Sequence, residues 1–426
     1  MIAATIGKKF LKVYNEKNGS AYTAKEFFTN EYFTLFFDDE KYMQWVTNSP
    51  FVQGIKKGVA PSPSERKQKL QALIDKVSGS NADASIAIGY PSLDYTATTS
   101  GQITNLNLPL DEEDVYASWI GSGLGIGVQG GLSILFDKAE LLLDLLEGWH
   151  IYRAYLNNTK KLRGNQINTW NGQWIAHRYN DRTYRSDDPT AGLNCMDTTR
   201  DGGMEINTQS WTAVMIGISK RYPDSRITGY VYNLGQTNTT IGFIPFELPQ
   251  IHKPLDLYEK YFGTRQREQA EHLFGTAFGF MQACQLGAIG IKALEPKGLR
   301  EFMQKGKIPS YNENDEEKKI YFNTYQIWLL AMLNNEQLWD TAQQFAAVLN
   351  RYASSAEKGK KDKTNNVNAV LSAGNKKQFI DNLTTIVEDA SNKTDYHDMA
   401  KLVNAMPNDN VPYFLTLIRF QFATIS

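Results

Sequence analysis

Cysteine is scarce in this chain, which has only Cys195 and Cys284 among its 426 residues. Two cysteines so far apart form no disulfide framework and no pair at the spacing of zinc ligands. The five histidines are scattered and do not combine with another ligand type at helical spacing. We therefore predict no metal site and no cofactor, and we expect a reducing cytoplasm as the compartment.

Long apolar runs and an excess of positive charge are also missing. No stretch reaches the length of about 18 apolar residues that a membrane span needs. The first residues, MIAATIGKKFLKVY, lack the apolar core of a signal peptide. The formal net charge is −1, whereas a general nucleic-acid binder is normally basic overall. We expect no membrane contact, and any nucleic-acid contact should be confined to one local patch.

The common catalytic motifs are absent as well. There is no G-x-S-x-G elbow and no Walker loop. The dipeptide His397-Asp398 resembles the first element of a metal-dependent phosphohydrolase site, but further ligands at a workable spacing are not evident. We predict a protein that is not an enzyme. A soluble enzyme with an unrecognised site in the β-rich half is one alternative, and a structural scaffold is another.

A glycine-rich segment, GSGLGIGVQGG, satisfies G-x-G-x-x-G at Gly125, Gly127 and Gly130. A dinucleotide site requires a helix that begins within this motif. Here the following residues, 132–136, are typical of a strand. We therefore expect these glycines to allow close approach of another backbone or a ligand.

Hydrophobic periodicity predicts an α+β fold in two parts. Residues 1–254 should form a mixed α/β domain that binds nucleic acid, with helices over 5–15, 22–37, 65–77 and 137–157, strands within 84–108, and an antiparallel β-meander over 210–219, 226–234 and 240–246. Residues 255–426 should form an all-α bundle that makes assembly contacts, with helices near 256–262, 264–286, 297–305, 316–335, 337–353, 373–391, 394–405 and 410–422. Expected helix caps are Ser64 and the pair Asp137 and Glu140, and a mobile basic loop is expected over 356–368.

The stretch 150–186 concentrates seven Arg or Lys residues and six Tyr or Trp rings against a single acid, Asp181, and five amides lie in its middle, over 165–173. Cations neutralise phosphates, rings stack on bases and amides read base edges. The candidate nucleic-acid-binding residues are Lys160, Lys161, Arg163, Asn165, Gln166, Asn168, Trp170, Asn171, Gln173, Trp174 and Arg178, together with the glycine-flanked pair Lys56 and Lys57. In the alternative interpretation, this stretch is a polar connection in which Trp170 and Trp174 are buried.

An α+β first part with the segment GSGLGIGVQGGLSILF is followed by the stretch GNQINTWNGQW and by a helical part ending in NAMPNDNVPYFLTLIRFQF. This order of segments resembles the large subunit of a type I CRISPR-associated Cascade surveillance complex. The resemblance implies a non-enzymatic subunit that contacts double-stranded target DNA near the protospacer-adjacent motif and helps to open it. The implied partners are the subunits of a guide RNA–protein complex and a recruited helicase–nuclease. The chain is shorter than some members and lacks their zinc-binding cysteines, and no site residue carries over by motif.

Overall fold

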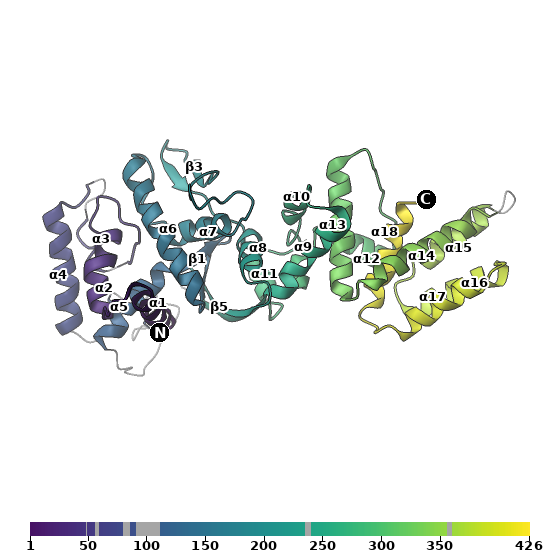
Figure 1. The fold of residues 1–426 in the computed structure, drawn as a ribbon, viewed down its shortest axis with the longest axis horizontal. Coiled ribbons are helices and arrows are strands. Elements are labelled where there is room, and N and C mark those ends of the chain that lie inside the picture. The colour runs from purple at the N-terminus through teal and green to yellow at the C-terminus, as the bar shows by residue number, and fades with distance from the viewer. Residues whose placement is uncertain (48, 56–58, 80–85, 91–110, 235–239, 356–359) are drawn as a thin grey trace. The chain divides into compact units, whose positions relative to one another are not determined.

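The computed structural model describes residues 1–47, 49–55, 59–79, 86–90, 111–234, 240–355 and 360–426 (Figure 1). The chain divides into two compact units, Met1–Leu248 and Pro249–Ser426. The first unit holds an antiparallel sheet and the second is helical, which confirms the predicted α+β class. Pro254 lies inside helix α9 (Leu248–Phe262).

Helices account for more of the first unit than strands do. Two of them, α1 and α5, cross so closely that a Cβ atom added to Gly7 would lie 1.9 Å from the carbonyl oxygen of Ala117. The helical elements of this unit are α1 (Ile2–Asn18), α2 (Ala24–Phe27), a π-helical turn η1 (Phe28–Tyr32), α3 (Phe33–Phe36), α4 (Pro63–Gly79), α5 (Glu112–Gly123), α6 (Ala139–Asn158), α7 (Ile167–Arg178) and α8 (Trp211–Arg221).

An aromatic cluster forms the core beside α1. The helical spacing of the rings in 22–37 predicts a buried face, and this is confirmed for Phe27, Phe28, Tyr32, Phe33, Phe36 and Phe37. The ring of Tyr32 stacks on Phe36 with centroids 3.9 Å apart, and both rings contact Trp149 of α6. These contacts hold α6 against the N-terminal helices.

The main sheet has four antiparallel strands in the order β1-β2-β5-β6, and a separate hairpin pairs β3 with β4. The predicted hairpin over 226–246 is confirmed by the pairing of β5 with β6, in which Tyr230 lies opposite Phe243. The strands are β1 (Ile126–Val128), β2 (Leu132–Phe136), β3 (Met196–Thr198), β4 (Met204–Ile206), β5 (Arg226–Asn233) and β6 (Thr240–Glu247).

The predicted strand over 210–219 is wrong, because these residues form helix α8. The Ser210 side chain accepts a hydrogen bond from the Ala213 amide at 3.2 Å and so caps the helix. Periodicity does not separate a short, fully buried helix from a buried strand. The strands expected over 84–108 fall mostly outside the described residues, and residues 86–90 form turns.

Two of the expected caps differ in the structure. The Ser62 hydroxyl, not that of Ser64, accepts from the Glu65 amide at 3.3 Å. Helix α6 is preceded by Lys138, which makes no capping hydrogen bond with its side chain, so the box expected from Asp137 and Glu140 is absent.

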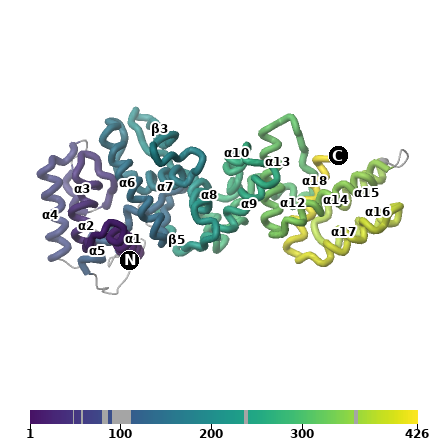
Figure 2. The backbone as a smooth tube through the Cα atoms, in the orientation of Figure 1, coloured from purple at the N-terminus to yellow at the C-terminus, as the bar shows by residue number. Residues whose placement is uncertain are grey.

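In the described part of the second unit every named secondary-structure element is a helix, and Figure 2 shows their backbone. Helix α18 provides its centre, with both apolar and polar side chains buried along most of its length. Besides α9, the helices are α10 (Arg267–Glu271), α11 (Phe280–Cys284), a 3-10 turn η2 (Ile291–Leu294), α12 (Leu299–Lys305), α13 (Glu316–Leu333), α14 (Gln337–Ala353), α15 (Lys360–Leu371), α16 (Lys376–Asp389), α17 (Thr394–Ala405) and α18 (Val411–Ala423).

Two predictions for this unit need correction. The single helix expected over 264–286 is interrupted at Gly275, whose φ of 74° is left-handed. The loop expected over 356–368 is helical from residue 360 onward. Val367, Val370 and Leu371 of that helix are buried at helical spacing, and their burial stabilises it despite its polar composition.

Candidate nucleic-acid interface

Helix α7 directs its two tryptophan rings into the core. Trp170 and Trp174 are both 0% exposed. Their indole nitrogens donate to carbonyl oxygens of α6, from Trp170 to Gly148 at 2.8 Å and from Trp174 to Asp144 at 2.7 Å. One face of Trp170 is stacked on Tyr152 at 5.1 Å between centroids. This corrects the interpretation of these rings as base-stacking groups, because in this fold neither has a free face.

The amides of the same stretch bind the backbone of the glycine-rich segment. Asn171, which is fully buried, donates to the carbonyl oxygens of Gly123 and Gly125 at 2.8 and 2.9 Å. Asn168 donates to Gly125 at 3.0 Å and to Ser122 at 3.3 Å. These side chains are therefore occupied inside the protein and are not free to read base edges.

The remaining internal amides bind the β3–β4 hairpin and the residues after it. Gln166 accepts from the Ile206 amide at 3.1 Å. Gln173 is buried and donates to the Asn207 carbonyl at 2.9 Å. Asn165 differs from these four, since it is exposed and has a left-handed backbone with φ of 62°.

Gly125 and Gly127, two of the three glycines expected to allow close approach, do so against α7, whereas a Cβ atom at Gly130 would meet nothing within 4 Å. A Cβ atom on Gly172 would lie 2.1 Å from the Gly127 carbonyl oxygen, and one on Gly127 would lie 2.8 Å from the Asn168 carbonyl oxygen. Strand β1 and helix α7 therefore meet backbone to backbone. The neighbour that these glycines accommodate is a helix of the same unit.

Substituting Gly172 with alanine is expected to destabilise the first unit by about 1–3 kcal/mol, because the new methyl group must push α7 away from β1. The matched control is Gly79→Ala, since a Cβ atom at Gly79 meets nothing within 4 Å. Urea denaturation of both variants measures the effect. Equal midpoints would contradict the proposed close packing.

Three cations follow the C-terminus of α6 on an ordered segment beside the hairpin. Lys161 accepts a backbone hydrogen bond from Met204 at 3.0 Å, and the Arg163 amide donates to Met204 at 2.8 Å. The side chain between them, Leu162, is 1% exposed and anchors the segment. Lys161 and Arg163 on either side of it are exposed, so their side chains point away from the core. Figure 1 shows the hairpin that contains β3 close to helices α6 and α7.

The three cations on this surface differ in whether a carboxylate lies close to them. Arg163 forms ion pairs with Asp201 at 2.8 Å and Glu205 at 3.2 Å, so carboxylates of the hairpin balance its charge. Lys160 and Lys161 are exposed, and within the ranges that the structure describes neither has a carboxylate at salt-bridge distance. These two ammonium groups are therefore available to an external anion.

Arg178 has a structural environment at the end of α7. Its guanidinium lies 3.3 Å from Glu147 and 3.5 Å from Asp144, and over the ring of Tyr184 at 4.5 Å. Burial, with the Asp144 carboxylate beside it, also raises the pKa of the Tyr179 phenol far above its ordinary value. This cluster links α6 to α7 and does not direct Arg178 toward a ligand.

A second chain segment, 41–45, lies along the cationic one. The Lys41 ammonium donates to the Thr159 and Leu156 carbonyls at 2.7 and 3.1 Å, and burial lowers its pKa. This segment ends in Trp45, which is 49% exposed. Composition did not single out Trp45, although Lys41, Lys56 and Lys57 lie close to it in sequence. Lys56 and Lys57 themselves lie outside the described residues.

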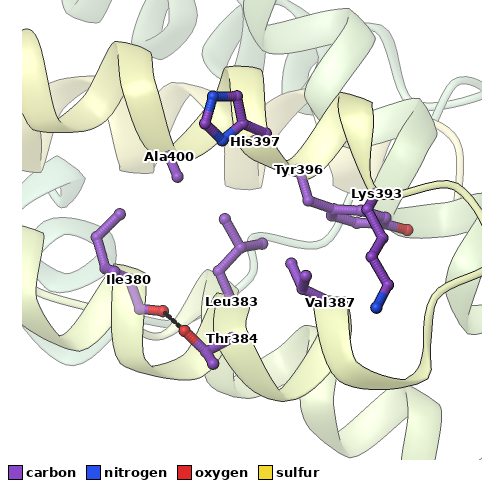
Figure 3. Close-up of a pocket in the computed structure, with 8 residues that line it drawn as sticks. All are labelled: Ile380, Leu383, Thr384, Val387, Lys393, Tyr396, His397 and Ala400. Atoms are coloured by element: carbon purple, nitrogen blue, oxygen red, sulfur yellow. Dashed lines mark hydrogen bonds between the residues drawn. The ribbon is translucent and has the colours of Figure 1, made fainter.

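A hollow of about 240 Å³ lies between α16 and α17 in the second unit (Figure 3). His397 is at its rim, and no carboxylate lines it. Across the described part of the chain, no three His, Cys, Asp or Glu residues are grouped as metal ligands. The residues lining the hollow are Ile380, Leu383, Thr384, Val387, Lys393, Tyr396, His397 and Ala400.

None of the helices that the structure describes combines the length and the apolar character needed to cross a membrane. No protein-family model, curated protein or solved structure matches this chain.

Proposed function

We propose that this chain is a non-enzymatic, nucleic-acid-contacting subunit of an RNA-guided DNA surveillance complex. One observation carries the proposal: Lys160 and Lys161 are exposed, without a carboxylate partner among the described residues, on a segment whose backbone is fixed by β4. Two ammonium groups on an anchored backbone are suited to binding neighbouring phosphates.

The division of labour in guide-directed complexes supports this assignment. Base pairing with the guide reads most of the sequence, and protein reads a short duplex element and the backbone. Since Asn168, Asn171 and Gln173 bind main-chain groups of this unit, the contact we propose is with phosphates and not with base edges. A net charge of −1 is compatible with such a local contact.

The partners follow from the resemblance and are part of the same proposal. They are the protein subunits that carry the guide RNA, the double-stranded target near its protospacer-adjacent motif, and a helicase–nuclease that acts after the DNA opens. The helical second unit would provide assembly contacts. Cys195 and Cys284 are both buried and unpaired, which fits the reducing cytoplasm that we propose as its location.

The proposal is tested with Lys160→Ala/Lys161→Ala in the full chain, co-expressed with the proteins encoded beside it. We expect weaker DNA binding and a slope of log affinity against log salt that is shallower by about 2, one unit for each lost phosphate contact. Titration of labelled duplex at several salt concentrations measures both quantities.

Two control variants sharpen this test. Lys12→Ala/Lys17→Ala removes the same charge from exposed positions of α1, and Arg163→Ala removes a cation whose charge two carboxylates already balance. Both should leave the salt slope unchanged. If the Lys160/Lys161 variant behaves like its controls, or if no RNA and no other subunit co-purifies, the proposal is wrong.

A protein scaffold is the second candidate function. It is favoured by the burial of Trp170 and Trp174 and by the carboxylates of Asp201 and Glu205 beside Arg163. A scaffold would retain its partner subunits and show no salt-dependent affinity for DNA. The same titration therefore distinguishes the two functions.

A further inference from the structure

We infer that Trp45 stacks on an unpaired base, so that the surface beside Lys160 and Lys161 takes a single-stranded segment of nucleic acid. This inference rests on the proposed function and names the class of ligand for the same surface.

Trp45 is distinguished from every other tryptophan by its exposure. All eight tryptophans lie within the described residues, and seven of them are 7% exposed or less, whereas Trp45 is 49% exposed. A large aromatic ring that is exposed while the other tryptophan rings are buried is a candidate for contact with another molecule.

The backbone that carries Trp45 is fixed to the cationic segment. The Tyr42 carbonyl accepts from the Asn165 amide at 2.7 Å, and the Met43 carbonyl accepts from the Ile167 amide at 3.2 Å. The next side chain, Gln44, is buried and donates to the Ser122 hydroxyl at 3.0 Å. The residue before Trp45 is thus anchored, and the ring extends from a rigid base.

Segment 41–45 pairs with segment 159–167, and Trp45 lies at one end of this paired region, whereas Lys160 and Lys161 lie at the other. The Lys41 ammonium binds the Thr159 carbonyl, one residue before Lys160, whereas Trp45 follows the contact between Met43 and Ile167. The backbone from Lys41 to Trp45 spans at most about 14 Å, and the Lys41 side chain extends from it to Thr159, which is a length suited to a few nucleotides. The exposed Asn165 lies between the two ends.

The chemistry of these groups favours a single strand over a duplex. Inside a duplex, away from its two ends, both faces of each base are covered by its neighbours, so no face is open to an indole ring. An unpaired base has a free face, and aromatic stacking with cations along the backbone is the usual mode of sequence-tolerant single-strand binding. Lysines contribute to both complexes, since both ligands have phosphates.

The experiment follows tryptophan emission of the full chain during titration with an oligothymidylate and with a blunt duplex of the same length. We expect quenching by the single strand and little change with the duplex, because Trp45 is the exposed emitter. Trp45→Ala should abolish the quenching and weaken single-strand binding about tenfold, with duplex affinity unchanged. The matched control is Phe243→Ala, which removes another exposed ring, 61% exposed, from the same unit.

The outcomes separate this inference from the proposed function. If Lys160→Ala/Lys161→Ala weakens binding of both ligands while Trp45→Ala changes neither, the single-strand inference fails and the proposed function stands. If neither variant changes any affinity, both fail. Equal quenching by the two ligands, or quenching that requires an added protein subunit and no nucleic acid, also overturns the stacking role of Trp45.

Discussion

Trp174→Ala is expected to lower the free energy of unfolding of the first unit by about 3–5 kcal/mol, the usual loss when a buried tryptophan is truncated. The ring is fully buried, and its indole nitrogen donates to Asp144. It lies directly on Gly148, where a Cβ atom would be 2.4 Å from the ring. Removing the ring leaves a cavity between α6 and α7 that these helices cannot close without moving.

Amide hydrogen exchange in peptides from 139–158 and 167–178 measures this loss locally. The matched control is Trp45→Ala, which truncates the exposed ring and should change stability by less than about 0.5 kcal/mol. The assignment of Trp174 to the core would be contradicted by a Trp174→Ala protein that keeps full protection and loses nucleic-acid binding.

Arg419→Ala is expected to destabilise the second unit by about 3–5 kcal/mol, because three main-chain carbonyls lose their donor and a long side chain is lost from the core. Arg419 is 1% exposed and lies in the middle of α18. Its guanidinium donates to the carbonyls of Phe302 at 2.7 Å and Ala373 at 3.0 Å, and to that of Leu371. Burial lowers its pKa to about 10, so the group is charged at neutral pH and depends on these acceptors.

Two further variants test whether the donors of Arg419 matter. Arg419→Met should lose less stability than the alanine variant, since it refills the volume and removes a desolvated charge. Arg351→Ala, at an exposed position of α14, should have almost no effect. Urea denaturation together with hydrogen exchange over 411–423 compares the three proteins. Equal stability of Arg419→Ala and Arg351→Ala would show that the buried hydrogen bonds do not stabilise the unit.

Helical spacing was sufficient to predict the aromatic face of residues 22–37 and most helices of the second unit. It was insufficient for residues 210–219 and 360–371. In the first case a continuous apolar run is compatible with both a strand and a buried helix. In the second, a polar segment folds because three apolar side chains meet a core from distant parts of the chain.

The candidate site also contains residues whose exposure the sequence indicated and residues whose burial it did not. Composition identified Lys160 and Lys161, whose accessibility follows from their position after a helix and beside a buried Leu162. It assigned Trp170, Asn171 and Trp174 to a ligand because rings and amides have the same chemistry inside a protein as on its surface. Whether these side chains are buried depends on which distant segments pack over them, and no local sequence pattern shows this.

The sequence by itself determined the α+β class and the helical second half, since local periodicity decides these features. Only the tertiary structure decided which polar groups have partners. The Asn171 amide meets Gly123, 48 residues earlier, and Arg163 meets Asp201, 38 residues later. Such contacts form because a whole core brings distant segments together, and they leave Lys160, Lys161 and Trp45 exposed.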